Sequence, residues 1–159
     1  LAFIAIVILS VYFYQKYKRK KNNIVQIKKP KIPPYKKALQ DFEVLRQKKL
    51  WQNDRIKEYH SELTDILRVY FENQLKIQAL EKTTDEILEA FEMQINDKRL
   101  YNMLSGILTL ADLVKFAKQL PLPDQHDLSL QNAIEIVNIT SQNSKNEMIS
   151  DSANNSNTK

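Results

Sequence analysis

The chain contains a single glycine, Gly106, among its 159 residues, and it has no Asn-Gly or Asp-Gly pair. Tight β-hairpins depend on residues that adopt a positive φ, and these two dipeptides are their strongest sequence signal. From Tyr35 onward, apolar residues recur instead at three- and four-residue steps, the period of an amphipathic helix. The sequence therefore predicts an all-α domain over residues 35–140, a compact bundle of five or six short helices.

Apolar stripes and turn residues place the first two helices. The first is expected to start near Tyr35, directly after two prolines. A turn follows at residues 51–54, where Asn53 or Asp54 is suited to cap the second helix. This second helix has the clearest apolar stripe, which comprises Ile56, Tyr59, Leu63, Ile66, Leu67, Tyr70 and Phe71.

Start and stop signals divide the rest of the domain. Thr83 and Glu86 have the spacing of a capping box and predict the start of a third helix. A fourth short helix is expected to end at or near Gly106, and Thr109 indicates the start of another. The last predicted helix carries Leu130, Ala133, Ile134 and Val137. Residues 141–159 are nearly free of apolar side chains and predict a disordered tail.

The N-terminal residues have the pattern of a membrane anchor. Residues 1–14 are apolar or aromatic apart from Ser10. A transmembrane helix needs roughly 20 residues, so we interpret residues 1–14 as the C-terminal part of a truncated span. Aromatic and basic residues at the expected headgroup level follow it: Tyr12, Tyr14, Tyr17, Lys16, Lys18, Arg19, Lys20 and Lys21. Excess Lys and Arg marks the cytoplasmic side, which predicts a single-pass protein with its C-terminal domain in the cytoplasm.

Two other interpretations of residues 1–14 compete with the anchor. A secretory signal peptide has its positive charges before the apolar stretch, and here they come after it. A buried core helix is the second alternative, because 14 apolar residues fall in the length range of such helices. A run of five cations within residues 16–21 is unusual directly after a core helix.

Charge is distributed unevenly along the chain. Residues 1–40 carry ten of the 24 basic side chains and none of the 19 acidic ones. We therefore interpret residues 15–34 as a basic juxtamembrane linker that is attracted to anionic lipid headgroups. The remaining residues hold 14 basic and 19 acidic side chains, and this mildly acidic balance argues against nucleic acid as a partner.

Signals for catalysis, cofactors and metals are sparse, so we predict a protein that is not an enzyme and holds neither cofactor nor metal. One glycine cannot form a phosphate-binding loop, and no cysteine is present. His60-Ser61-Glu62 matches the H-x-E of zinc deaminases, but that site also needs cysteine ligands. We interpret His60 as a structural residue. His126 is the only other histidine and falls in a predicted loop, so a two-His metal site would require chance proximity.

Acidic residues on the second helix have a simpler explanation than cation binding. Glu58, Glu62 and Asp65 share one helix surface at three- and four-residue spacing. We expect them to form a solvated face that pairs with the basic residues Arg55, Lys57 and Arg68.

Residues 112–118 offer a candidate docking surface. Asp112, Lys115, Phe116 and Lys118 are the candidate partner-binding residues. In the alternative interpretation, Leu113, Val114 and Phe116 or Ala117 fill the core while both lysines face water.

A second candidate function is that of a membrane-tethered DNA-binding regulator of helix-turn-helix type. Its recognition helix would be the third helix, which carries four acidic residues and no basic ones.

Several short segments together resemble a known family. They are Leu50-Trp51-Gln52, Lys57-Glu58-Tyr59, residues 63–68 with Tyr70, residues 83–87, and residues 112–118 with Pro121. In combination they resemble small membrane proteins of the bacterial aerotolerance (Bat) operon and the cytoplasmic tail of BatD-type proteins. The resemblance covers most of residues 35–140 and brings no catalytic residues.

The resemblance implies a single-pass inner-membrane protein with a helical cytoplasmic domain. Proteins of this family are encoded beside a MoxR-type AAA+ ATPase and von Willebrand factor A-domain membrane proteins, and a role in envelope stress tolerance is presumed for the system. These proteins are therefore the implied partners. Residues and resemblance together predict a membrane-anchored helical adaptor.

Overall fold

A computed structural model describes residues 32–156 of the chain, with side-chain environments for residues 32–143. The described part contains five α-helices and no strand, which confirms the predicted all-α class. They are α2 (Pro34–Gln47), α3 (Ile56–Tyr70), α4 (Thr84–Ile95), α5 (Lys98–Ala117) and α6 (Pro123–Ser156). A 3-10 turn (Trp51–Asn53) precedes α3, and a π-helical turn (Phe71–Leu75) extends it. The predicted transmembrane segment 1–14 and the linker residues up to 31 lie outside the described residues.

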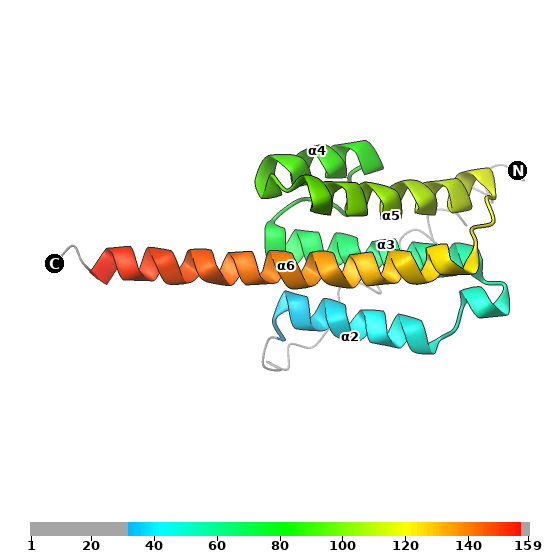
Figure 1. Ribbon diagram of the computed structural model, residues 1–159, viewed down its shortest axis with the longest axis horizontal. Helices are drawn as coiled ribbons and strands as arrows, with labels where there is room; N and C mark the ends of the chain where they lie inside the picture. Colours follow the sequence, from blue (N-terminus) through cyan, green and yellow to red (C-terminus); the bar gives the residue numbers. More distant parts are fainter. Residues whose placement is uncertain (1–31, 157–159) are drawn as a thin grey trace, which may run out of the picture. The chain divides into compact units, whose positions relative to one another are not determined.

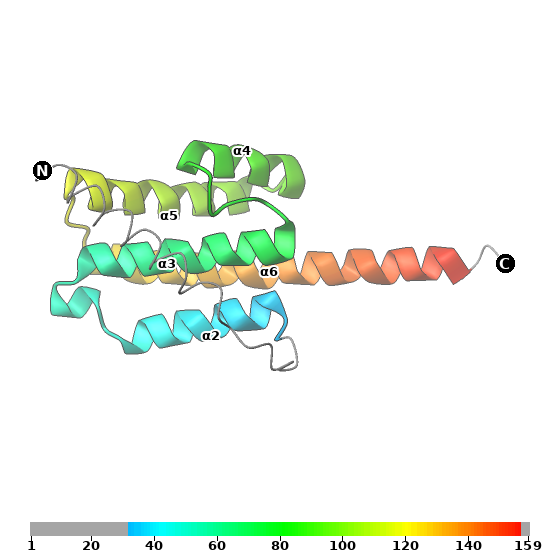
Figure 2. The same cartoon turned by 180° about the vertical axis from the view of Figure 1, so that it is seen from behind.

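Four of these helices form an antiparallel bundle. Around the bundle, α2 contacts α3, α3 contacts α5, α5 contacts α6, and α6 contacts α2. Figure 1 shows that α2 and α5 run in one direction and that α3 and α6 run in the other. The remaining helix, α4, packs on α5 outside this ring, as the reverse view in Figure 2 also shows. Short connections between antiparallel neighbours favour this arrangement.

The first two helices follow their predicted stripes, but the second starts differently. Pro34 opens α2, where a missing backbone N–H costs nothing. The buried face of α3 includes Tyr59, Leu63 and Leu67, as expected. The predicted cap at Asn53 or Asp54 is wrong, because Asp54 adopts a left-handed conformation with φ 58° that ends the 3-10 turn. Arg55, and not Asp54, is the residue directly before α3. Its side chain makes no capping hydrogen bond, so α3 begins without a side-chain cap.

The predicted capping box of the third helix is confirmed in α4. Thr83 Oγ1 accepts a hydrogen bond from the Glu86 backbone N–H at 3.4 Å. In return, the Glu86 carboxylate accepts one from the Thr83 backbone N–H at 2.8 Å. Two of the unpaired N–H groups at the helix start are thereby satisfied. The bond from the Thr83 backbone N–H, and a second one from the Thr83 hydroxyl at 2.7 Å, hold the pKa of the Glu86 carboxyl below its usual value.

The fourth and fifth predicted helices are one continuous helix, so the expected break at Gly106 is wrong. This helix, α5, has 20 residues, and Thr109 lies within it. A glycine inside a helix costs about 1 kcal/mol relative to alanine. Leu104 and Ile107 are buried on either side of Gly106, and their burial offsets that cost. The sequence signal that was missed is Asp97, whose carboxylate caps α5 by accepting from the Arg99 and Leu100 N–H groups.

The last helix extends beyond the predicted domain boundary at residue 140. Ser141 is buried, and α6 is assigned as far as Ser156, into the segment expected to be disordered. Residues 124–156 contain no proline or glycine, so the sequence provides no residue that breaks the helix. At its other end, α6 includes His126, which was expected in a loop.

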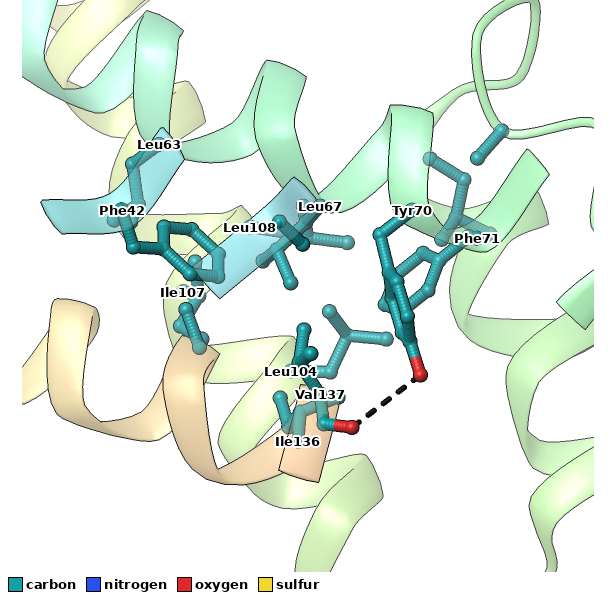
Figure 3. Packing of buried hydrophobic residues seen from close by; sticks show 14 of the residues in the cluster. Phe42, Leu63, Leu67, Tyr70, Phe71, Leu104, Ile107, Leu108, Ile136 and Val137 are labelled. Atoms are coloured by element: carbon teal, nitrogen blue, oxygen red, sulfur yellow. Dashed lines mark hydrogen bonds between the residues drawn. The ribbon is translucent and has the colours of Figure 1, made fainter. Parts of the chain in front are cut away.

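The core lies between the four bundle helices and extends beneath α4, which contributes Ile87, Leu88 and Phe91. Figure 3 shows Phe42 of α2 with Leu63 and Leu67 of α3, facing residues of α5 and α6. The Tyr70 hydroxyl donates to the Val137 carbonyl at 3.3 Å, which links α3 to α6. Burial raises the pKa of Tyr70 to about 12.

Among the described helices, α5 alone is long and apolar enough to cross a membrane by length and composition. The central helix of a bundle meets the same criteria. Its buried residues are Leu100, Leu104, Ile107, Leu108, Ala111 and Val114. Because α5 contacts α3, α4 and α6, we interpret it as a core helix of the folded domain.

Candidate functional site

An open groove of about 530 Å³ lies between the start of α4 and the C-terminal half of α5. It forms because α4 has 12 residues and α5 has 20, so α4 leaves the last turns of α5 uncovered. The lining residues are Thr83, Thr84, Asp85, Thr109, Asp112, Leu113, Phe116 and Ala117. We call this feature the α4–α5 groove.

A polar contact between the two helices forms part of the groove. Thr84 Oγ1 donates to Asp112 Oδ2 at 2.6 Å. A hydroxyl that donates to a carboxylate makes a short, strong bond, so this contact fixes the start of α4 against α5. Both side chains are half-buried, whereas the neighbouring Asp85 carboxylate is exposed.

The apolar part of the groove comes from the end of α5. Phe116 is 81% exposed and Leu113 is 40% exposed. The predicted burial of Val114 is confirmed, but the alternative that Phe116 or Ala117 fills the core is wrong, because both are exposed. Complete burial of a phenylalanine side chain is worth roughly 1.5–3 kcal/mol relative to exposure to water, and Phe116 does not gain this free energy within the domain. A partner that covers this exposed ring at the groove would recover that burial.

The structure separates the four residues of the predicted docking surface. Asp112 and Phe116 line the α4–α5 groove. Lys115 instead points toward α3, where its ammonium group donates to Thr64 Oγ1 at 2.9 Å, and burial lowers its pKa. Lys118 follows α5 in a left-handed conformation and does not line the groove.

The remaining predicted site residues belong to the membrane interface. Tyr12, Tyr14, Tyr17 and the five cations of residues 16–21 lie outside the described residues.

The sequence did not indicate that Thr83, Thr84 and Asp85, at the start of α4, belong to the groove. The capping box indicated where α4 starts, but no signal indicated that this start meets Asp112.

The two histidines lie side by side in the core. His60 Nε2 is 3.1 Å from His126 Nδ1, and both side chains are buried. Trp51 stacks on the His126 ring with a centroid separation of 4.9 Å. The Tyr59 hydroxyl donates to the His126 backbone carbonyl at 2.9 Å. These contacts join the start of α6 to α3 and to the 3-10 turn that precedes α3.

The histidine pair has the features of a buried structural contact. Among residues 32–156, no group of three or more His, Cys, Asp or Glu side chains is placed to hold a metal ion. His60 Nδ1 is buried without a hydrogen-bond partner. Burial, the neighbouring His126 and the charge of Lys115 lower the pKa of His60 to about 4. His60 therefore stays neutral in the folded protein near pH 7.

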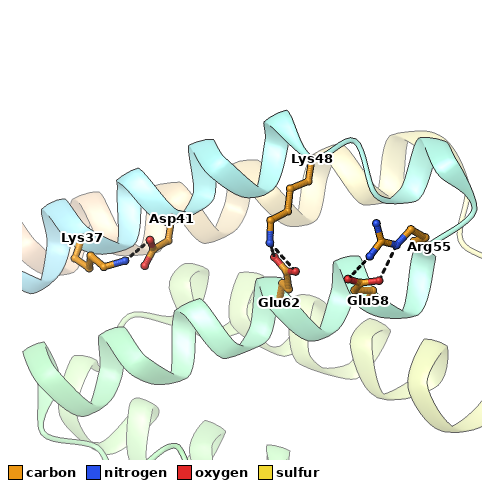
Figure 4. A network of polar contacts seen from close by, with 6 residues as sticks. All are labelled: Lys37, Asp41, Lys48, Arg55, Glu58 and Glu62. Atoms are coloured by element: carbon orange, nitrogen blue, oxygen red, sulfur yellow. Dashed lines mark hydrogen bonds and ion pairs between the residues drawn. The ribbon is translucent and has the colours of Figure 1, made fainter. Parts of the chain in front are cut away.

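Two acidic side chains of α3, Glu58 and Glu62, are engaged by cations, as Figure 4 shows. Glu58 accepts from Arg55 at 2.6 Å, which confirms one predicted pair. Glu62 accepts from Lys48 at 2.6 Å, a contact between α2 and α3 that was not predicted. Arg68 instead donates to the backbone carbonyls of Ala79 and Lys82 in the connection to α4. Surface ion pairs of this kind contribute at most about 1 kcal/mol each.

The outer face of α4 is acidic. Asp85, Glu86, Glu89 and Glu92 are exposed on this helix, which carries no Lys or Arg. A helix with this charge repels phosphate, so it is unsuited to be the recognition helix of a DNA-binding domain.

Comparisons of the chain with protein families, with functionally described proteins and with solved structures find no match. The resemblance to Bat-operon proteins stays a prediction from the residues that carry it.

Proposed function

We propose that this chain is a membrane-anchored helical adaptor that holds a protein partner at the cytoplasmic face of the inner membrane. Residues 1–14 are the proposed anchor, and residues 35–140 with their helical extension are the proposed interaction domain. On the basis of the family resemblance, the proposed partners are a MoxR-type AAA+ ATPase and von Willebrand factor A-domain membrane proteins in envelope stress tolerance.

The uncovered end of α5 is the observation that supports an interaction role. Phe116 and Leu113 present exposed apolar surface beside a groove, although the same helix buries apolar residues along the rest of its length. Aromatic side chains are among the residues that contribute most to binding at protein interfaces. The groove is lined by threonine, aspartate and apolar residues.

Co-purification from detergent extract tests this function. We expect the full chain to enrich an AAA+ ATPase or an A-domain protein relative to a control that ends at residue 34. This control keeps the proposed anchor and the basic linker, so the enrichment reports on the helical domain. A full chain that enriches neither class above the control would contradict the adaptor role.

Membrane attachment is tested separately. We expect the full chain to stay in the membrane fraction after alkaline extraction, and a chain that begins at residue 22 to be released. A full chain that is extracted as readily as the shortened one would contradict the anchor.

A further inference from the structure

The α4–α5 groove has a chemical character that limits what it can bind. Its lining contains two carboxylates, Asp85 and Asp112, and no Lys or Arg. The carboxylates of Glu86 and Glu89 continue this negative charge along the exposed face of α4. Lys115 of α5 does not line the groove: its ammonium group donates to Thr64 of α3, and it also interacts electrostatically with Asp112. The groove thus combines an acidic side with an apolar side made by Leu113, Phe116 and Ala117.

The dimensions of the groove match a short stretch of helix. The part of α5 that lines it covers residues 109–117, which corresponds to roughly 12 Å, or about two helical turns. A small ligand usually has most of its surface buried, whereas Phe116 leaves this groove open to solvent. No strand is present in residues 32–156 to offer an edge for an extended peptide. An amphipathic helix that lays its apolar face into a groove is an established mode of peptide recognition.

We infer that the α4–α5 groove binds an amphipathic helix of a partner protein, with an apolar stripe against Leu113 and Phe116 and with Lys or Arg beside that stripe. The basic side chains pair with Asp85 and Asp112. This inference rests on the proposed adaptor function and specifies the chemistry of the partner segment.

Site-specific photo-cross-linking in intact cells tests the location and the chemistry together. The probe is p-benzoylphenylalanine, introduced into the full chain in place of Phe116. The matched control has the same probe in place of Met93, which is 76% exposed on α4 and does not line the groove. Mass spectrometry then identifies the cross-linked peptide.

The expected result is a cross-link from position 116, and not from position 93, to a helical protein segment with apolar residues at three- and four-residue steps and Lys or Arg beside that stripe. A cross-linked segment without Lys or Arg, or one from a second copy of this chain, would overturn the inferred chemistry while leaving an interaction role in place. A cross-link only from position 93, or only to lipid, would overturn the location. No protein cross-link at either position, from a chain shown to be in the membrane, would contradict the adaptor function itself.

The contribution of charge is measured with a synthetic peptide of the cross-linked segment. Asp85→Asn combined with Asp112→Asn removes both charges, and the amide oxygen introduced at position 112 can still accept from Thr84. We expect the double variant to bind about two- to tenfold more weakly. Its control is Glu43→Gln with Asp54→Asn, an equal change of charge at exposed positions on α2 and in the turn before α3. Equal peptide affinities for the two double variants would overturn the charge pairing.

Discussion

The imidazole rings of His60 and His126 meet in the core, with Nε2 of the first 3.1 Å from Nδ1 of the second. This contact joins α3 to the first turn of α6 across 66 residues of sequence. Because the pair is buried beside Lys115, the folded protein resists placing a proton on His60. The Asp127 carboxylate opposes this effect at His126, whose pKa is nevertheless lowered by burial.

Acid is expected to destabilise the domain through this pair. The pKa of His60 is about 4 in the folded protein and 6.5 for an unperturbed histidine, so the unfolded state binds more protons between these values. The contribution of His60 to the free energy of unfolding is therefore complete above pH 6.5, and it is lost as the pH is lowered toward 4. At about 1.36 kcal/mol per pKa unit, the loss is at most about 3 kcal/mol.

Urea denaturation across this pH window, on wild type and on His60→Leu, measures the effect. The variant is expected to lose most of the pH dependence, whatever its stability at neutral pH. A variant that keeps the wild-type slope would show that other groups cause the acid sensitivity.

Gly106→Ala should stabilise the domain. Gly106 is exposed in the middle of α5, and a Cβ atom built on it meets nothing within 4 Å. Alanine at such a site is expected to raise the free energy of unfolding by about 1 kcal/mol. Ser105→Ala, at the neighbouring position, is the control and should gain less. A loss of stability on Gly106→Ala would mean that the helix breaks at this point.

Thr83→Ala should weaken the start of α4. The substitution removes the hydroxyl that accepts from the Glu86 N–H, and loss of such a cap costs about 1 kcal/mol. Thr109→Ala is the matched control, because Thr109 also lines the groove but lies inside α5. Thermal or chemical denaturation should show a clear loss for the first variant and none for the second. Equal losses would contradict a specific capping role.

Phe91→Ala tests whether α4 is an integral part of the domain. Phe91 is fully buried, and its ring centroid lies 5.4 Å from that of Phe71. Removal of a buried phenylalanine costs about 3–5 kcal/mol. Met93→Ala, at an exposed position of the same helix, should change stability by less than about 0.5 kcal/mol. A small effect at both positions would indicate that α4 is not firmly packed on the bundle.

The all-α fold class and the start of α4 were predictable from the sequence, because both depend on residues that are close to one another in the chain. The stripe of α3 and the Thr83–Glu86 capping box both lie within a few turns of chain. The continuity of α5 was not predictable in this way, because packing of Leu104 and Ile107 outweighs the local preference of Gly106. The length of α6 was also not predictable. Its polar C-terminal part, residues 141–156, contains no proline or glycine and is assigned as helix.

The candidate groove depends on contacts that are distant in sequence. It forms only because α4 folds back on α5, so that Thr84 meets Asp112. The sequence indicated residues 112–118 as a docking surface, yet it could not show that Lys115 turns toward Thr64 while Phe116 stays exposed. The proximity of the two histidines has the same origin, since it arises from helix packing and leaves no local pattern.

The most direct test of the adaptor role compares three full-length chains in the same detergent extract: wild type, Phe116→Ser and Met93→Ser. Both substitutions replace an exposed apolar residue, so neither should affect folding. If the proposed ATPase and A-domain partners co-purify, quantitative mass spectrometry should show wild-type amounts of them with Met93→Ser and about a tenfold reduction with Phe116→Ser. Equal recovery with both variants would contradict binding at the α4–α5 groove.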